Sequence, residues 1–295
     1  MDTAPLLSVR DYHQIFPIDT FHHVHAVSGV NFDIYPGEIF GLVGESGSGK
    51  STLARAIMGI YKPSKGEIYY QNQCITNKHI PHELKKTLQR DLQIIFQDSS
   101  VALNPRMSIE DCIAEPLVIH KLLPDKKERR EHIISLLHQV GLNSSLLEKI
   151  PAEISGGQKQ RVSIARALAL EPKLIIADEP VSSLDVSIQA QIINLFIKLR
   201  QEKEFTLLFI AHDLSMVQYL CDRVGVMYKG RIVEIAPAKI LFNNPLHPYT
   251  QMLLSAIPKP DPDTEKTKNF SQHIEIKLNK NAKLKELEPQ HFVLE

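Results

Sequence analysis

The sequence predicts an α/β fold, in which a parallel-sheet core carries an antiparallel β part and an α-helical part. Three observations support this fold. Short apolar runs alternate with segments of helical spacing, as expected for strands joined by crossover helices. A glycine-rich turn separates an apolar run at 38–43 from a helical pattern at 52–58. Helical patterns also fill residues 107–170, between two apolar runs. We therefore expect a helical insertion between strands of one sheet.

The N-terminal part is expected to be antiparallel. Residues 6–18 and 24–34 have the composition of strands, and the second of them ends at a Pro-Gly turn. The turn at 63–66 leads into a short strand at 67–70, which is typical of a hairpin.

The remaining elements follow from apolar runs and helical spacing. Buried strands are predicted at 92–96, 174–177 and 206–211, and a hairpin at 224–228 and 231–235. Helices are predicted at 108–120, 125–140, 157–170 and 186–200. Because Lys, Asn and Glu dominate after Pro258, we expect residues 259–285 to form an exposed, weakly structured tail. The apolar residues 291–294 are then expected to dock on the fold.

The composition argues against several classes of function. Lys and Arg together number 34, as do Asp and Glu, so there is no bulk attraction to nucleic acid or anionic lipid. The three cysteines lie far apart without metal-type spacing, which favours a reducing compartment. No apolar run is long enough to span a membrane, and the first residues lack the pattern of a signal peptide. We expect a cytosolic protein that reaches a membrane only through a partner.

The glycine-rich turn has the sequence and the flanking elements of a phosphate-binding P-loop. Its glycines let successive backbone N–H groups converge on an anion, and the helix N-terminus adds partial positive charge there. Lys50 is expected to neutralise the β- and γ-phosphates of ATP, and the Ser51 hydroxyl to coordinate Mg²⁺. The predicted nucleotide-binding residues are Gly44, Glu45, Ser46, Gly47, Ser48, Gly49, Lys50, Ser51 and Thr52.

Polar side chains follow the predicted parallel strands. Asp178 and Glu179 come at the end of one strand, where the carboxyl edge of a parallel sheet lies beside a P-loop. We expect Asp178 to hold Mg²⁺ through water or Ser51, and Glu179 to polarise the water that attacks the γ-phosphate. Gln97 is expected to reach Mg²⁺ and that water, and His212 to bond the γ-phosphate and orient Glu179.

A second glycine-bearing helix start lies far downstream of the P-loop. Ser155 is a good N-cap, and Gly156 and Gly157 leave backbone N–H groups uncovered. One P-loop already holds a triphosphate. We therefore expect this second anion site, which includes Gln158, to serve a nucleotide held by another subunit.

These motifs, in this order over residues 30–235, resemble the ATP-binding subunit of an ABC transporter. The matches are residues 44–51 with Walker A, Gln97 with the Q-loop, residues 154–158 with the signature motif, residues 174–178 with Walker B, Glu179 with the catalytic glutamate, residues 183–185 with the D-loop and His212 with the switch histidine. The signature match has Ile154 where leucine is usual. The resemblance implies a RecA-like core and a head-to-tail dimer, in which ATP lies between one P-loop and the opposite signature motif.

The same resemblance assigns two further nucleotide contacts. Asp185 belongs to the segment that matches the D-loop. An aromatic residue shortly before the P-loop is implied to stack on adenine, and the family's spacing favours Phe21, with Phe16 and Tyr12 as alternatives.

Two more segments resemble the oligopeptide and dipeptide importer ATPases. Residues 96–106 look like their segment after the Q-loop, and residues 245–258 look like their C-terminal extension. The Pro-Asp-Pro sequence at 260–262 favours the F-type subunit of a D/F heterodimer. The resemblance implies a D-type partner cassette, two integral membrane permease subunits and, indirectly, an extracellular solute-binding protein. Residues 98–101 lack the proline common there, and the tail lacks the cysteines of some relatives, so no iron–sulfur cluster is expected.

The predicted activity is ATP hydrolysis that powers peptide uptake at the cytoplasmic face of a membrane. The expected domains are an ATPase domain at 1–235 with its helical part at about 100–170, the importer extension at 236–262, and a polar tail at 263–295. A nickel or other small-solute importer, a non-transport ABC ATPase acting on ribosomes or DNA, and an exporter cassette are the alternatives. Three histidines at 22, 23 and 25 have no cysteine or carboxylate companion, so no metal site is expected there.

Overall fold

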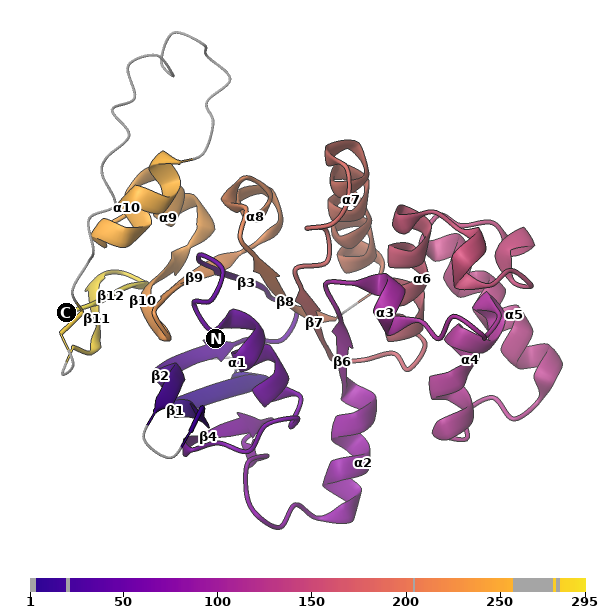
Figure 1. The fold of residues 1–295 in the computed structure, drawn as a ribbon, viewed down its shortest axis with the longest axis horizontal. Helices are drawn as coiled ribbons and strands as arrows, with labels where there is room; N and C mark the ends of the chain where they lie inside the picture. Colours follow the sequence, from indigo (N-terminus) through magenta and orange to yellow (C-terminus); the bar gives the residue numbers. More distant parts are fainter. Residues whose placement is uncertain (1–3, 20–21, 204, 257–277, 280–281) are drawn as a thin grey trace, which may run out of the picture. The chain divides into compact units, whose positions relative to one another are not determined.

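The computed structural model describes residues 4–19, 22–203, 205–256, 278–279 and 282–295 (Figure 1). The chain divides into two compact units. The first comprises residues 34–38 and 75–210, with the N-terminal segment that ends at Leu6. The second comprises the described parts of residues 7–33, 39–74 and 211–295.

The first unit contains a parallel sheet, in which β7 lies between β6 and β8. The strands are β6 (Leu92–Ile95), β7 (Leu174–Asp178) and β8 (Thr206–Ala211). Leu174 pairs with Leu92 on one side and with Thr206 on the other, so the three strands begin in register. Every residue of β7 and β8 is buried, because such apolar runs are covered on both faces of a parallel sheet. The predicted strands at 92–96, 174–177 and 206–211 are confirmed.

Helices make up most of the rest of the first unit. They are α2 (His82–Asp91), α3 (Ser99–Ala102), α4 (Ile109–Ile119), α5 (Lys126–Gln139), α6 (Gly156–Leu168) and α7 (Val186–Glu202), with the 3₁₀ turns η1 (Ser144–Leu146) and η2 (Pro151–Glu153). The helices α4, α5 and α6 contact one another, and α3 contacts α6 (Figure 1). The predicted helices at 108–120, 125–140, 157–170 and 186–200 are confirmed, and α2 is an additional helix.

Local side-chain bonds explain why these helices begin where they do. Ser108 accepts a hydrogen bond from the backbone of Asp111 at the start of α4, and Asp125 caps α5 in the same way. The guanidinium of Arg166 on α6 then ties the bundle together, because it donates to Glu115 on α4 at 2.6 Å and to the carbonyl of Ala102 at 2.8 Å.

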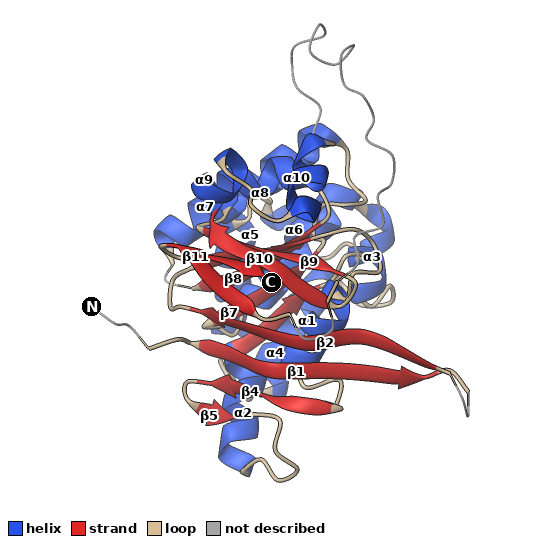
Figure 2. Ribbon diagram, turned by 90° about the vertical axis from the view of Figure 1, so that its left-hand side faces the viewer, coloured by secondary structure: helices blue, strands red, loops and turns tan. Residues whose placement is uncertain are grey.

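The second unit contains an antiparallel sheet with the strand order β2-β1-β4-β5 (Figure 2). Its strands are β1 (Leu7–Pro17), β2 (His23–Ile34), β4 (Lys65–Tyr70) and β5 (Gln73–Cys74). The predicted antiparallel part is confirmed. The same unit holds strands in the order β3-β9-β10-β12-β11, namely β3 (Ile39–Val43), β9 (Arg223–Tyr228), β10 (Arg231–Pro237), β12 (His291–Leu294) and β11 (Leu284–Glu288). Only the β3–β9 pair among these is parallel.

The helices of the second unit are short. They are α1 (Lys50–Ile57), α8 (Leu214–Leu220), α9 (Ala238–Asn243) and α10 (Pro248–Ser255). The helix predicted at 52–58 is thus confirmed as α1, and the hairpin predicted around residues 229–230 is confirmed as β9 and β10.

The C-terminal segment adds a hairpin to β10. Glu234 and Ile235 of β10 pair with Val293 and Phe292 of β12, so the predicted docking of residues 291–294 is confirmed. Residues 257–277 lie outside the described part of the chain. Most of the predicted weakly structured tail at 259–285 is therefore not tested, and its described end contradicts the prediction, because Ala282 is buried and β11 begins at Leu284. The polar tail predicted at 263–295 therefore ends in two strands of the sheet.

Candidate functional site

The P-loop joins the buried strand β3 to the helix α1 within the second unit. Its backbone requires glycine at both ends. A Cβ on Gly44 would lie 2.1 Å from the carbonyl oxygen of Met227, and one on Gly49 would lie 2.3 Å from that of Ala26. Both residues also have positive φ, 149° and 106°. The middle of the loop is open, since nothing lies within 4 Å of a Cβ placed on Gly47.

Lys50 supplies positive charge within this loop. Its side chain is buried, and its Nζ donates to the carbonyl oxygens of Gly44 at 2.7 Å and Glu45 at 2.9 Å, and lies 3.5 Å from the Ser48 hydroxyl. A buried ammonium group is a strong attractant for an anion. Ser51 and Thr52 follow it in the first turn of α1 and are half-buried. These residues fit a nucleotide phosphate group and, at Ser51, a hard cation such as Mg²⁺.

Asp178 and Glu179 lie at the carboxyl end of β7 in the first unit. Asp178 is buried and pairs in register with Ile210 of β8. Glu179 is half-buried and has a φ of +49°, which is uncommon for a residue with a side chain. Its N–H donates to Ile210 at 3.0 Å, and its carbonyl accepts from the backbone and the hydroxyl of Ser182 at 3.3 and 3.2 Å. Hydrogen bonds on both sides therefore hold this backbone in place.

Gln97 and His212 follow the neighbouring strands. Gln97 comes two residues after β6 ends at Ile95, and His212 directly follows β8. Both side chains are exposed. Because parallel strands end at one edge of a sheet, the ends of β6, β7 and β8 place polar groups on that edge.

No ready-made metal cage accompanies these groups. Among the described residues, no cluster of three or more His, Cys, Asp or Glu side chains could hold a metal ion. Mg²⁺ typically uses one or two protein ligands together with phosphate oxygens and water. Ser51, Gln97 and Asp178 remain the predicted protein ligands.

The second helix start lies in the first unit and is capped as predicted. The Ser155 hydroxyl accepts from the Gln158 N–H at 3.3 Å, and the Gln158 side chain accepts from the Ser155 N–H at 3.0 Å. This capping box leaves Ser155 and Gly156 exposed at the beginning of α6. A Cβ on Gly156 would meet only Leu184, at 3.6 Å, whereas one on Gly157 would come within 2.8 Å of Ile188. Gly157 is therefore required by packing, and Gly156 is not.

Asp185 lies at the N-cap of α7, where its exposed side chain makes no capping bond. The backbone of Asp185 caps the helix instead. Its carbonyl oxygen accepts hydrogen bonds from the backbone N–H groups of Ile188 and Gln189, both at 2.9 Å. An exposed carboxylate that does not serve its own helix can serve a ligand or a partner.

The predicted adenine-stacking residue Phe21 lies outside the described residues. Of the two alternatives, Tyr12 is fully buried and its hydroxyl donates to Gln14 at 2.7 Å, so its ring has no free face. Phe16 packs edge-on against Tyr61, with 5.1 Å between the ring centroids.

The C-terminal extension makes a contact with the P-loop that was not predicted from the sequence. The hydroxyl of Tyr249, on α10, accepts a hydrogen bond from the backbone N–H of Glu45 at 3.1 Å. From the sequence, Tyr249 belongs only to the segment 245–258, which resembles the C-terminal extension of the importer ATPases. The signal that could have singled it out is the Pro-Tyr start of a short helix, but spacing alone does not indicate what that tyrosine touches.

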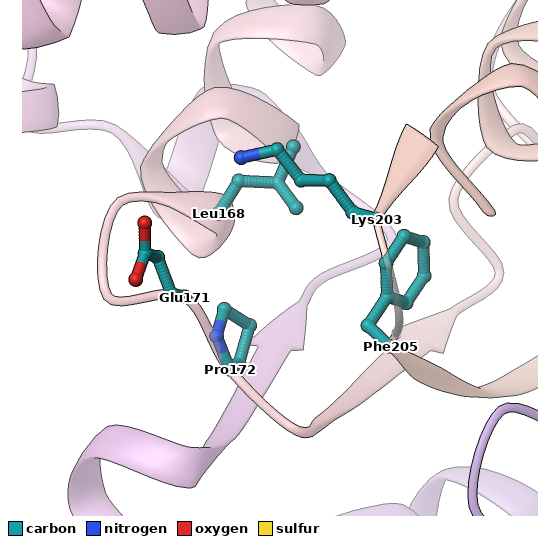
Figure 3. A pocket seen from close by; sticks show the side chains of 5 residues that line it. All are labelled: Leu168, Glu171, Pro172, Lys203 and Phe205. Atoms are coloured by element: carbon teal, nitrogen blue, oxygen red, sulfur yellow. The ribbon is translucent and has the colours of Figure 1, made fainter. Parts of the chain in front are cut away.

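A pocket of about 310 Å³ in the first unit is separate from these groups (Figure 3). It is lined by Leu168, Glu171, Pro172, Lys203 and Phe205. These residues precede β7 and β8 or end the helices before them, so the pocket lies at the amino ends of the strands. Asp178 lies at the opposite, carboxyl end of β7.

No helix in the described part of the chain combines the length and the apolar character needed to cross a membrane.

Comparisons with known proteins agree with the motif reading. The family described as "ABC transporter" matches residues 27–182, and the family described as "Oligopeptide/dipeptide transporter, C-terminal region" matches residues 233–282. The oligopeptide transport ATP-binding protein OppF of Bacillus subtilis is 50% identical, over 99% of this chain and 96% of its own length. OppF of Streptococcus mutans is 47% identical, over 98% and 94%. The dimeric, post-hydrolysis structure of the ATP-binding cassette MJ0796 with ADP and phosphate has a TM-score of 0.71 and 29% identity, over 79% of this chain and 98% of that one.

Proposed function

Because this chain belongs to the ABC transporter ATPase family, we propose that it is the ATP-hydrolysing subunit of an importer for oligopeptides. The match of its C-terminal region to the oligopeptide and dipeptide transporter family is the observation that carries the substrate class. The curated relatives that match nearly the whole chain are named as oligopeptide transport ATP-binding proteins. Neither observation favours a nickel importer, a non-transport ATPase or an exporter cassette.

In the proposed reaction the P-loop binds the triphosphate of ATP. Lys50 exchanges its bonds to Gly44 and Glu45 for bonds to the β- and γ-phosphates, which are stronger because both partners are charged. Ser51, Asp178 and Gln97 would hold Mg²⁺, which draws charge from the phosphate oxygens when it is bound. The carboxylate of Glu179 accepts a proton from the attacking water.

The backbone conformation of Glu179 determines where its carboxylate lies, as the role of proton acceptor requires. Its left-handed conformation is bonded to Ile210 and Ser182, so its carboxylate projects from a rigid strand end. His212 follows β8, the strand that bonds Glu179, and in this proposal it contacts the γ-phosphate and orients the carboxylate.

The proposal also pairs this cassette with a second one, head to tail. The exposed start of α6 at Ser155 and Gly156 would receive the phosphates of a nucleotide bound to the partner's P-loop, with Gln158 and Asp185 beside it. The F-type features imply that the partner is a D-type cassette. The helical part of the first unit would contact two permease subunits, and a solute-binding protein would deliver peptide from outside. In this proposal the chain lies on the cytoplasmic face of the membrane.

The substrate assignment predicts a selective loss of uptake. Cells whose genomic copy carries Glu179→Gln should lose uptake of a labelled tetrapeptide and keep uptake of radioactive nickel at the wild-type rate. A variant with Glu171→Gln, which alters an exposed glutamate of the same unit, should retain both. Loss of nickel uptake with peptide uptake intact would contradict the assignment.

The dimer assignment predicts that Gly156→Ala separates activity from stability. A Cβ at this position meets only ordinary van der Waals contact within the chain, and alanine is favoured in helices, so the melting temperature should stay equal or rise slightly. The added methyl group would occupy the space that the partner's nucleotide needs. ATP turnover of the assembled importer should therefore fall at least about tenfold, as for the loss of one charge-assisted hydrogen bond. Lys159→Ala on the same helix is the control, and unchanged turnover in Gly156→Ala would reject the role of this helix start.

A further inference from the structure

Tyr249 connects the C-terminal extension to the P-loop. It is the second residue of α10 and is fully buried. Its ring packs against that of Tyr228 with 4.2 Å between centroids and 33° between the ring planes, which orients the hydroxyl. That hydroxyl accepts the backbone N–H of Glu45 at 3.1 Å. Burial raises the pKa of Tyr249 to about 12, so the hydroxyl stays neutral at physiological pH.

The Tyr249 hydroxyl bonds to a peptide unit that is hydrogen-bonded on both sides. The N–H of the peptide between Gly44 and Glu45 bonds to Tyr249, and its carbonyl bonds to Nζ of Lys50 at 2.7 Å. On its N-terminal side, Gly44 has a φ of 149° and lies against the carbonyl of Met227. The orientation of this one peptide thus sets where the P-loop leaves β3.

Nucleotide binding would draw Lys50 away from this peptide. The phosphates compete for the Lys50 ammonium, which is buried in the loop and bonds the Gly44 carbonyl in the present arrangement. The tyrosine hydroxyl accepts from an N–H on the far side of the peptide and can stay. We propose that Tyr249 is a positioning residue for ATP: its hydroxyl keeps the Gly44–Glu45 peptide in place when Lys50 turns to the phosphates. This inference rests on the proposed ATPase function and adds a residue outside the cassette motifs.

The position of Tyr249 is itself fixed by buried polar groups. His247 caps α10 by accepting the Tyr249 N–H on Nδ1 at 3.1 Å. Burial lowers the pKa of His247, although nearby Glu234 opposes this, and the neutral ring keeps that nitrogen free to accept. The backbone N–H of His247 donates to the carboxylate of Glu234 at 3.0 Å. His247 and Glu234 are both buried, so water does not replace these bonds.

The C-terminal hairpin completes this support. His291 of β12 is fully buried, and its Nε2 lies 2.6 Å from the carboxylate of Glu234 on β10. The same carboxylate also accepts the N–H of Leu246 at 2.8 Å. The last strand of the chain is therefore linked through Glu234 and the start of α10 to the P-loop, within one compact unit. This explains why polar groups rather than apolar ones fill this part of the second unit.

The test is Tyr249→Phe in the assembled importer, with Tyr228→Phe as the control. Phenylalanine keeps the ring packing in both variants, but only the first removes the bond to the P-loop. One lost hydrogen bond corresponds to about a three- to tenfold change in an equilibrium constant. The KM for ATP and the Kd for MgADP should therefore rise by about that factor in Tyr249→Phe, with kcat at saturating ATP within about twofold of wild type. Tyr228→Phe should match wild type.

Hydrogen exchange gives a second, direct measurement. In the absence of nucleotide, the amide of Glu45 should exchange faster in Tyr249→Phe than in wild type, whereas the amides of α10 should not. A lower melting temperature with unchanged KM, Kd and Glu45 exchange would overturn the inference, as would an equal rise of KM in Tyr228→Phe. If the wild-type complex itself failed to hydrolyse ATP, the proposed function would fall instead, so the two failures are distinguishable.

Discussion

Glu179→Gln should lower ATP turnover by at least about a hundredfold, the usual contribution of a general base, while MgATP still binds. Glutamine keeps the shape of the side chain but cannot accept the proton of the attacking water. The backbone at this position already adopts a φ of +49° and bonds to Ile210 and Ser182. Since these bonds use only backbone groups of residue 179, the substitution leaves them in place. The measurement is steady-state ATPase activity of the purified importer together with the Kd for MgATP.

The matched control for this variant is Glu171→Gln. Glu171 lies in the same unit and also has a positive φ, of 50°, but it lies at the amino end of β7. It should keep wild-type turnover. Full activity in Glu179→Gln would remove this residue from its proposed role, and loss of activity in both variants would point to a stability effect instead.

Lys50→Met should weaken MgATP binding by about 10- to 150-fold, the equivalent of one charge-assisted hydrogen bond to phosphate. Methionine preserves most of the buried stem and removes the ammonium group. The loss should exceed that of Tyr249→Phe, because the lysine bonds charged oxygens and the tyrosine bonds a neutral N–H. Equilibrium binding of a fluorescent ATP analogue measures the effect, with unfolding monitored alongside.

Arg55→Met provides the comparison on the same helix. Arg55 lies in the last turn of α1 and is exposed, so it bears an equal charge without facing the loop. Its Kd for MgATP should match that of wild type. Equal weakening in both variants would mean that the general charge of α1, and not the ammonium inside the loop, attracts the nucleotide.

The elements that could be predicted from the sequence are those whose local residue pattern matches their environment in the fold. The run 174–177 is apolar throughout and is buried on both faces, so its strand could be predicted without knowing its neighbours. The helix that begins at Gly156 could be located because Ser155 and Gln158 form its cap from the sequence itself. Motif order then assigned Glu179 and Gln97 to strand ends, where the structure places them.

The missed parts depend on contacts between distant residues. The helix α2 is mostly polar, and Leu84 and Leu88 are its only apolar residues, so it has too few apolar residues to reveal a helix. The strand β11 reads Leu-Lys-Glu-Leu-Glu and is mostly exposed, and it forms because β12 is already paired with β10. Likewise, nothing near Tyr249 in the sequence indicates the Glu45 amide, which is 204 positions away.

The most direct test of the central claim, that two cassettes share each nucleotide, is the molar mass of the Glu179→Gln protein mixed with the proposed D-type cassette. Light scattering should show separate single cassettes without nucleotide and paired cassettes with MgATP, and Gly156→Ala added to the same chain should prevent the pairing. Single cassettes that have bound MgATP and still do not pair would contradict the account.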